Sequence, residues 1–357
     1  MSQRRESIVT DEVTRPEAAP GTEREPGAHP RPDTETEGDA ERDAGRDANR
    51  GVSRDTGRDV HRETDIDAVG RTSLLTAAIR AVEHRRADRI HTDPYAESLS
   101  GEAGVGLLAE MLDGVQVTEQ QLRLLSVGDV IAIRTRYFDD WLQAAAREVP
   151  QVVSLASGMD CRAYRLDWPE GLRYFELDRA PVIAYKEDRL ADVPPRADHR
   201  TVRADLADPD WGKRLLAAGY DPELPSAWLM EGLLYYLPES AVRQVLAQVR
   251  DFTTPGSTVG LDLASVDALS GQLDVFNRWG CPWLFGTDRP EEFLASYGFT
   301  ARVVQPGDPT ASYGRWSGPV QPRSAEGARR AFFVEAERRA ADQATGRAPL
   351  NDSVAVR

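Results

Sequence analysis

The sequence predicts an α/β fold with a mostly parallel, seven-stranded sheet and helices on both faces. Two observations indicate it. Short apolar runs, typical of buried strands, alternate with longer segments of helical periodicity after residue 149. Acidic residues also follow the first four of these runs directly. Strands that alternate with helices pair in parallel, and the carboxyl ends of such strands meet at one edge of the sheet.

The composition divides the chain into three parts. Residues 1–65 are polar, charged and rich in proline and glycine, with too few apolar residues to offset the entropy of ordering, so we expect a disordered tail. Residues 339–357 return to this composition and are expected to form a second tail. Between them we expect one domain, 66–338, made of an N-terminal helical cap (66–148) and an α/β core (149–338).

Helical periodicity in the cap begins at Ser73. Asp93 and Pro94 form a helix-start signal, with the aspartate as N-cap and the proline in the first turn. A longer helix is expected from Val127 to Arg147. In the core the expected strands are 152–155, 172–178, 201–204, 226–230, 257–263, 301–304 and 331–334, and the expected helices are 180–190, 211–218, 238–250 and 290–297.

The stretch 150–186 has the pattern of a nucleoside-binding βα unit. A turn of small residues, Ala156 to Gly158, follows the first strand, and an acid suited to a ribose diol, Asp178, follows the second about twenty residues later. The glycines that cradle a pyrophosphate are absent, and Asp160 and Glu176 would repel one. We therefore expect a nucleoside without phosphates, such as S-adenosylmethionine. The alternative is an ordinary βα turn with a solvated acid.

Four acids extend this pattern along the predicted sheet edge. Asp160, Asp178, Asp205 and Glu231 lie just past the ends of the first four strands, where they would line one crevice. A crevice of this charge favours a sulfonium cation that carries an adenosine.

The whole-chain totals exclude several classes of function. A net charge of -15 argues against nucleic-acid binding, which needs a basic face. Two cysteines, Cys161 and Cys281, give neither a disulfide framework nor a paired metal motif, so no metal site is predicted. We find no membrane span and no signal peptide, and therefore expect a cytoplasmic protein without membrane association.

Four segments of the core can be read as a set of motifs, namely VVSLASGMDCRAYRL, YFELD, ADLADPDW and LMEGLLYYLPESAV, with DPYA and RTRYFDDW upstream. In order and spacing they resemble the motifs of the leucine carboxyl methyltransferase family, closest to its branch of actinobacterial S-adenosylmethionine-dependent methyltransferases and polyketide O-methyltransferases. The resemblance covers roughly Thr72 to Arg338. It implies a Rossmann-like class I methyltransferase fold and S-adenosyl-L-methionine as cofactor.

The resemblance also implies roles for single residues. Gly158 and Asp160 match the first motif, in which Ala156 stands where the family usually has a glycine. Asp178 matches the acid that binds the ribose hydroxyls. If position 156 needs a positive φ, alanine costs roughly 1 kcal/mol or more there.

Four further residues are carried over in the same way. Asp205 and Leu206 match the position that reads the adenine edge, and Glu231 matches the acid near the methionine part of the cofactor. Arg134 corresponds best to the arginine that pairs with the cofactor carboxylate, with Arg136 as the alternative.

The predicted function is O-methylation of a small-molecule acceptor, a carboxylate or a phenol and for example a polyketide, by in-line transfer driven by proximity and orientation. No histidine follows the fourth strand, so we expect no dedicated base; Tyr235 and His91 are the remaining candidates. The alternatives are methylation of a protein C-terminal carboxylate and a non-catalytic, cofactor-binding regulator. The sequence does not predict the oligomeric state.

Overall fold

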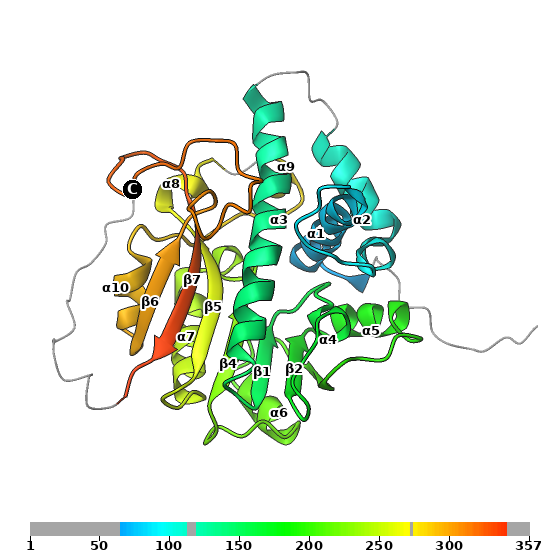
Figure 1. Cartoon of the computed structure of the whole chain (residues 1–357), viewed down its shortest axis with the longest axis vertical. Helices are drawn as coiled ribbons and strands as arrows, with labels where there is room; N and C mark the ends of the chain where they lie inside the picture. The colour runs from blue at the N-terminus through cyan, green and yellow to red at the C-terminus, as the bar shows by residue number, and fades with distance from the viewer. Residues whose placement is uncertain (1–64, 113–118, 272–273, 341–357) are drawn as a thin grey trace, which may run out of the picture. The chain divides into compact units, whose positions relative to one another are not determined.

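The computed structural model describes residues 65–112, 119–271 and 274–340, all within one compact unit (Figure 1). The expected tail 1–65 lies outside these residues except for Asp65, and so do residues 341–357 of the expected C-terminal tail.

The sheet has seven strands in the order β3-β2-β1-β4-β5-β7-β6. All neighbouring pairs are parallel except those of β7, which runs antiparallel to both β5 and β6. This confirms the predicted fold class. The order of the strands reverses between β1 and β4, so their carboxyl ends form the crevice in which such sheets bind ligands. The strands are β1 (Gln151–Leu155), β2 (Arg173–Asp178), β3 (Asp198–Arg203), β4 (Ser226–Met230), β5 (Thr258–Ala264), β6 (Phe299–Val304) and β7 (Ala331–Arg338).

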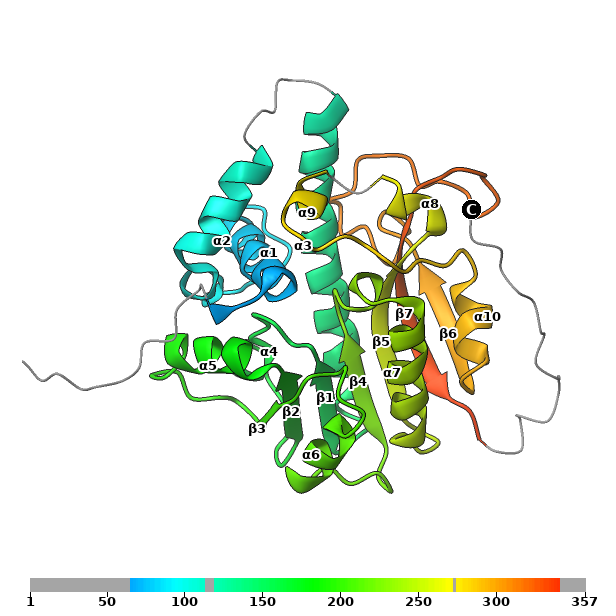
Figure 2. The same cartoon turned by 180° about the vertical axis from the view of Figure 1, so that it is seen from behind.

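Alternation along the strands places apolar side chains on both faces of the sheet. Val153 and Phe175 pack in one core with the helices α6 (Trp211–Ala217), α7 (Glu239–Asp251) and α10 (Pro290–Ala295). Their neighbours Val152 and Tyr174 pack in a second core with α3 (Glu119–Ala145), α4 (Arg162–Arg165) and α5 (Ala180–Arg189). The two views from opposite sides show α7 on one face and α3 across the other (Figures 1 and 2).

The expected cap consists of three helices. α1 (Ala68–Arg85) begins at Asp67, whose side chain accepts a hydrogen bond from the Gly70 amide, and it packs along α2 (Ala96–Leu112). The third helix, α3, crosses the sheet and contacts β4 and β5. α1 lies beyond the carboxyl ends of β1 and β2, so it covers the ligand edge of the sheet (Figure 1).

Some of the element boundaries predicted from the sequence were wrong. The helix expected from Val127 begins earlier, at Glu119, and the third strand begins at Asp198 rather than Thr201. Its first residues are exposed or half-buried because β3 is an edge strand, so they lack the apolar signal of a buried one. The short elements α4, η2 (Leu234–Tyr236), α8 (Val266–Leu269) and α9 (Asp274–Arg278) were not predicted. Within the ranges described, no helix combines the length and apolarity needed to cross a membrane.

Candidate active site

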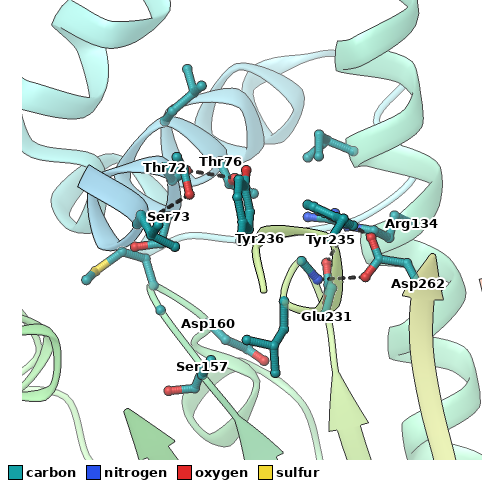
Figure 3. A pocket seen from close by; sticks show the side chains of 18 of the residues that line it. Thr72, Ser73, Thr76, Arg134, Ser157, Asp160, Glu231, Tyr235, Tyr236 and Asp262 are labelled. Carbon is teal, nitrogen blue, oxygen red and sulfur yellow. Dashed lines mark hydrogen bonds and ion pairs between the residues drawn. The ribbon is translucent and has the colours of Figure 1, made fainter. Parts of the chain in front are cut away.

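A cavity of about 660 Å³ opens at the carboxyl ends of the central strands, beneath α1. Figure 3 shows Asp160 and Ser157 on the side of the sheet and Thr72, Ser73 and Thr76 on the α1 side. Tyr235 lines this cavity. So do all eight predicted cofactor-binding residues, which are Arg134, Ala156, Gly158, Asp160, Asp178, Asp205, Leu206 and Glu231. The structure therefore brings together residues that the sequence distributes over almost one hundred positions.

The turn after β1 is held by Asp178, the last residue of β2. The backbone amides of Gly158 and Arg179 donate to the two carboxylate oxygens of Asp178, each at 2.7 Å. Burial of Asp178 raises the pKa of its carboxyl group, against the lowering effect of these hydrogen bonds. The acid thus holds the turn in place and still lines the cavity.

Both ends of this turn have left-handed backbone: φ is +49° at Ala156 and at Gly158. The sequence left open whether position 156 needs a positive φ, and the structure shows that it does. Alanine at this conformation carries the cost of about 1 kcal/mol that glycine avoids. Gly158 is also packed closely, because a Cβ there would lie 2.6 Å from the Cβ of Ser73 on α1.

Glu176, two residues before Asp178, does not line the cavity. Its carboxylate is fully buried and pairs with Lys186 at 3.1 Å and with His199 at 2.8 Å. Lys186 also donates to the Ser157 hydroxyl at 3.1 Å. Glu176 therefore supports the turn from below, and its effect on a ligand is indirect.

Arg134 on α3 lies between two carboxylates at the end of β4 and β5 (Figure 3). Its Nε donates to Glu231 at 2.9 Å, and its Nη1 donates to Asp262 at 2.9 Å and to the Tyr235 hydroxyl at 3.1 Å. The second guanidinium nitrogen, Nη2, makes no hydrogen bond with the described part of the chain. The alternative, Arg136, pairs with Asp140 and does not line the cavity.

A second arginine, Arg162, continues the network toward β1. Its Nη1 lies 2.8 Å from carboxylate oxygens of both Asp160 and Glu231, and its Nε donates to Asp139 at 2.7 Å. Burial alone would raise the pKa of Asp160 and of Glu231, but Arg162 and the other neighbouring cations together outweigh it, so both pKa values are lowered. Both acids are therefore ionised at neutral pH.

With all its acids ionised, the network carries one negative charge in excess, although burial raises the pKa of the Asp262 carboxyl group. Four carboxylates, those of Asp139, Asp160, Glu231 and Asp262, share three guanidinium groups, those of Arg134, Arg162 and Arg165. S-adenosylmethionine bears a sulfonium, an ammonium and a carboxylate, and hence one positive charge in excess. The residues present fit this group in charge, in the close approach of the 156–158 turn, and in the free Nη2 of Arg134.

Asp205 and Leu206 lie at the open end of the cavity. Asp205 is exposed, and one of its carboxylate oxygens accepts a hydrogen bond from the Ala207 amide at 2.9 Å. Leu206 is half-buried and packs against the core of the sheet.

The two candidate bases differ in position. Burial raises the pKa of Tyr235 well above its ordinary value, so its phenol is protonated at neutral pH, and its hydroxyl is bound by Arg134. His91 is buried outside the cavity lining, and burial lowers its pKa to about 3. Tyr235 therefore lines the cavity but keeps its own proton, whereas His91 does not line the cavity.

Sequence reasoning missed Asp262 and Arg162, which complete the network. A charged residue inside the otherwise apolar strand TVGLDLA was a signal for Asp262. Nothing in the sequence around Arg162 marks it as a site residue. Its role depends on Glu231, which the fold brings to 2.8 Å from its guanidinium.

Comparison with known proteins supports the family. The family model "Leucine carboxyl methyltransferase" matches residues 73–250. A protein of Saccharopolyspora erythraea, named as an S-adenosyl-L-methionine-dependent methyltransferase, is 39% identical over 275 residues that span 70% of this chain and 90% of that protein. The chain belongs to the leucine carboxyl methyltransferase family. It is an S-adenosylmethionine-dependent methyltransferase.

Further matches of this methyltransferase agree. A Mycolicibacterium smegmatis protein named for the same activity is 43% identical over 200 residues, covering 55% of this chain and 67% of that protein. Among solved structures, a DUF574 family protein from Streptomyces avermitilis has a TM-score of 0.52 at 12% identity, covering 75% of this chain and 97% of that chain, which supports the fold.

Proposed function

We propose that this methyltransferase methylates an oxygen atom, carboxylate or phenol, of a small-molecule acceptor. The observation that carries the proposal is that one cavity combines the charged network at the strand ends with a lining of apolar and aromatic side chains, which suits a compact organic acceptor beside the cofactor. When bound, S-adenosylmethionine supplies an electrophilic methyl group on a sulfonium.

We assign the cofactor-holding roles as follows. Asp178 would accept hydrogen bonds from the ribose hydroxyls, and Asp205 with Leu206 would contact the adenine at the open end. Glu231 would lie near the ammonium, and Arg134, through its free Nη2, would pair with the carboxylate. Ala156, Gly158 and Asp160 would form the floor of this part of the cavity.

The contribution of these residues is position rather than proton transfer. Ion pairs with Arg134 and Arg162 fix the Glu231 side chain before a ligand binds. This side chain therefore loses little conformational freedom on binding. α1 lies across the cavity from the strand ends, where it would limit the access of water to a bound ligand (Figure 3). Orientation of this kind supplies on the order of 7–11 kcal/mol of a bimolecular barrier.

A general base is not part of the proposal. A carboxylate acceptor is already ionised at pH 7, because its reference pKa is about 4. Tyr235 is protonated, and His91 lies outside the cavity lining, so an acceptor phenol would need an acidic hydroxyl of its own.

The other functions are less well supported. Relatives named as methyltransferases do not favour a non-catalytic regulator. Among the residues that the structure describes, no contact favours an extended peptide end as acceptor. We propose a role in secondary metabolism within the cytoplasm, where the two free cysteines, Cys161 and Cys281, would stay reduced.

Calorimetric titration with S-adenosylmethionine and S-adenosylhomocysteine tests the first half of the proposal, and we expect micromolar binding of both. Release of S-adenosylhomocysteine in the presence of carboxylic acids and phenols tests the second half. Turnover with a C-terminal peptide and with none of the small molecules would overturn the proposed acceptor class.

A further inference from the structure

One side of the cavity is an aromatic wall, defined here as Tyr235, Tyr236, Phe276 and Trp283. The ring centroids of Tyr235 and Trp283 are 4.8 Å apart, as are those of Tyr235 and Tyr236, and Phe276 lies 6.2 Å from Trp283. Tyr236 packs against the Tyr235 ring, and burial raises the pKa of its hydroxyl to about 12. The wall is therefore fixed, protonated and uncharged at neutral pH.

Aliphatic side chains from the cap helices line the cavity together with this wall. They are Val69, Leu75 and Ile79 of α1 and Val127, Val130 and Ile131 of α3. An apolar slot of aliphatic and aromatic residues is suited to a flat, hydrophobic molecule. The polar cofactor has its own partners at the strand ends, so this compartment is left for the acceptor.

The arginines of the cavity separate into two kinds. Seven arginines in the described ranges line it, and six of them are held by carboxylates or backbone carbonyls: Arg80, Arg134, Arg162, Arg165, Arg179 and Arg330. The seventh, Arg329, makes no hydrogen bond or ion pair with any residue that the structure describes. It is a cation without a charge partner on the cavity lining.

Arg329 lies at the rim of the cavity, just before β7. Its side chain is exposed and packs against Gly271, where an added Cβ would lie 2.2 Å from the guanidinium Nε. The neighbouring Arg330 differs, because its guanidinium donates to the carbonyls of Ala328, Pro322 and Ala325. Arg329 therefore remains available to a ligand in the same cavity.

We infer that the aromatic wall and Arg329 form the acceptor subsite, and that the acceptor is a flat, hydrophobic molecule with an anionic group that Arg329 binds. This inference rests on the proposed function and narrows its substrate class to aromatic hydroxy acids. In this inference the anionic group is bound by Arg329 for recognition, and the methylated oxygen belongs to a second group, an acidic hydroxyl, because no base faces it. Methyl transfer then forms the oxygen–methyl bond and breaks the sulfur–methyl bond, and the hydroxyl proton leaves to solvent.

The test compares two probes that differ by one carboxylate, 6-hydroxy-2-naphthoic acid and 2-naphthol. Each is titrated calorimetrically into the protein saturated with S-adenosylhomocysteine, so that the cofactor compartment is filled. We expect the acid to bind about tenfold more tightly, as a charge-assisted hydrogen bond to the exposed Arg329 guanidinium provides. Arg329→Gln should bring the two dissociation constants close together.

Two matched controls separate the subsite from general effects. Arg289→Gln removes an exposed arginine that does not line the cavity and should keep the tenfold difference. Phe276→Ala should weaken both probes about tenfold, whereas Leu284→Ala, beside Trp283 but exposed and outside the lining, should weaken neither.

Equal binding of the two probes by the unmodified protein, or a difference that survives Arg329→Gln, would overturn the inference. So would failure of both probes to bind the loaded protein. Failure of the proposed function has a different signature, namely probe binding that follows this pattern without release of S-adenosylhomocysteine from S-adenosylmethionine.

Discussion

The two sides of the cavity are built in opposite ways. At the strand ends, the network around Glu231 pairs every guanidinium with a carboxylate, and buried charges are stable only when they are paired in this way. On the side of the aromatic wall the lining is apolar, and Arg329 has no charge partner among the described residues. The difference indicates that the first region is preorganised for a fixed ligand, while the second leaves a charge for the acceptor to satisfy.

The largest expected effect comes from removing the acid of the strand-end region. Asp178→Ala should weaken S-adenosylhomocysteine binding at least about 100-fold, because hydrogen bonds from a ribose diol to a carboxylate are worth roughly 1.5–3 kcal/mol each. Calorimetry on a sample that thermal unfolding shows to be folded provides the measurement. Asp192→Ala, an exposed acid before β3, is the matched control and should bind normally. Unchanged binding in Asp178→Ala would remove the basis of the site assignment.

The second effect probes the point where the strand-end region meets α1. Gly158→Ala combines an unfavourable positive φ with a Cβ only 2.6 Å from that of Ser73, and should lower the free energy of unfolding by about 2–3 kcal/mol. Urea denaturation measures it. Adding Ser73→Gly to this variant should recover the stability lost to the Cβ–Cβ clash, but not the stability lost to the positive φ of Ala at position 158. A double variant as unstable as the single one would contradict the close packing.

The third effect concerns the buried neutral histidine next to the charged network. Burial lowers the pKa of His91 to about 3, so between that value and about 6.5 the unfolded chain binds a proton that the folded protein does not. Stability should therefore fall as the pH falls through this range, by up to about 1.4 kcal/mol per pH unit. In His91→Phe this component should be absent, and urea denaturation at pH 7 and pH 5 compares the two proteins. Equal pH dependence would contradict the neutral state of His91.

The smallest effect has the opposite sign. Ala156→Gly relieves the alanine that occupies left-handed backbone, and should raise the free energy of unfolding by up to about 1 kcal/mol without weakening cofactor binding. Thermal unfolding and calorimetry check both parts. If the glycine variant is less stable, the greater conformational entropy that glycine gives to the unfolded chain outweighs the relief of backbone strain at this position.

The strand-end region was largely predictable because its signals are local. Each acid lies at the end of a recognisable strand or within a few residues after it, so the parallel fold alone brings Asp160, Asp178 and Glu231 to one edge. Asp262 was missed because an acid inside a strand is understood only with its partner Arg134, 128 positions away in the chain. The assignment of ligand roles to these residues stays a prediction.

The aromatic wall was less accessible to sequence reasoning. The segment from Leu269 to Phe285 is visibly rich in aromatic residues, but aromatic residues pack in cores as readily as they line pockets. Arg329 has no motif around it, and its significance depends on the other six cavity arginines having partners. Such a property belongs to the assembled structure and to no single stretch of sequence.

The antiparallel strand β7 has a consequence for the order of folding. It lies between β5 and β6, and it pairs Ala336 with Val259 and Phe332 with Leu263, so the inner edge of β5 has no partner until the last strand has been synthesised. An open strand edge is a site of aggregation. A ribosome-bound chain that ends before Ala331 would expose this edge, and insertion of β7 between β5 and β6 would be the step that completes the sheet.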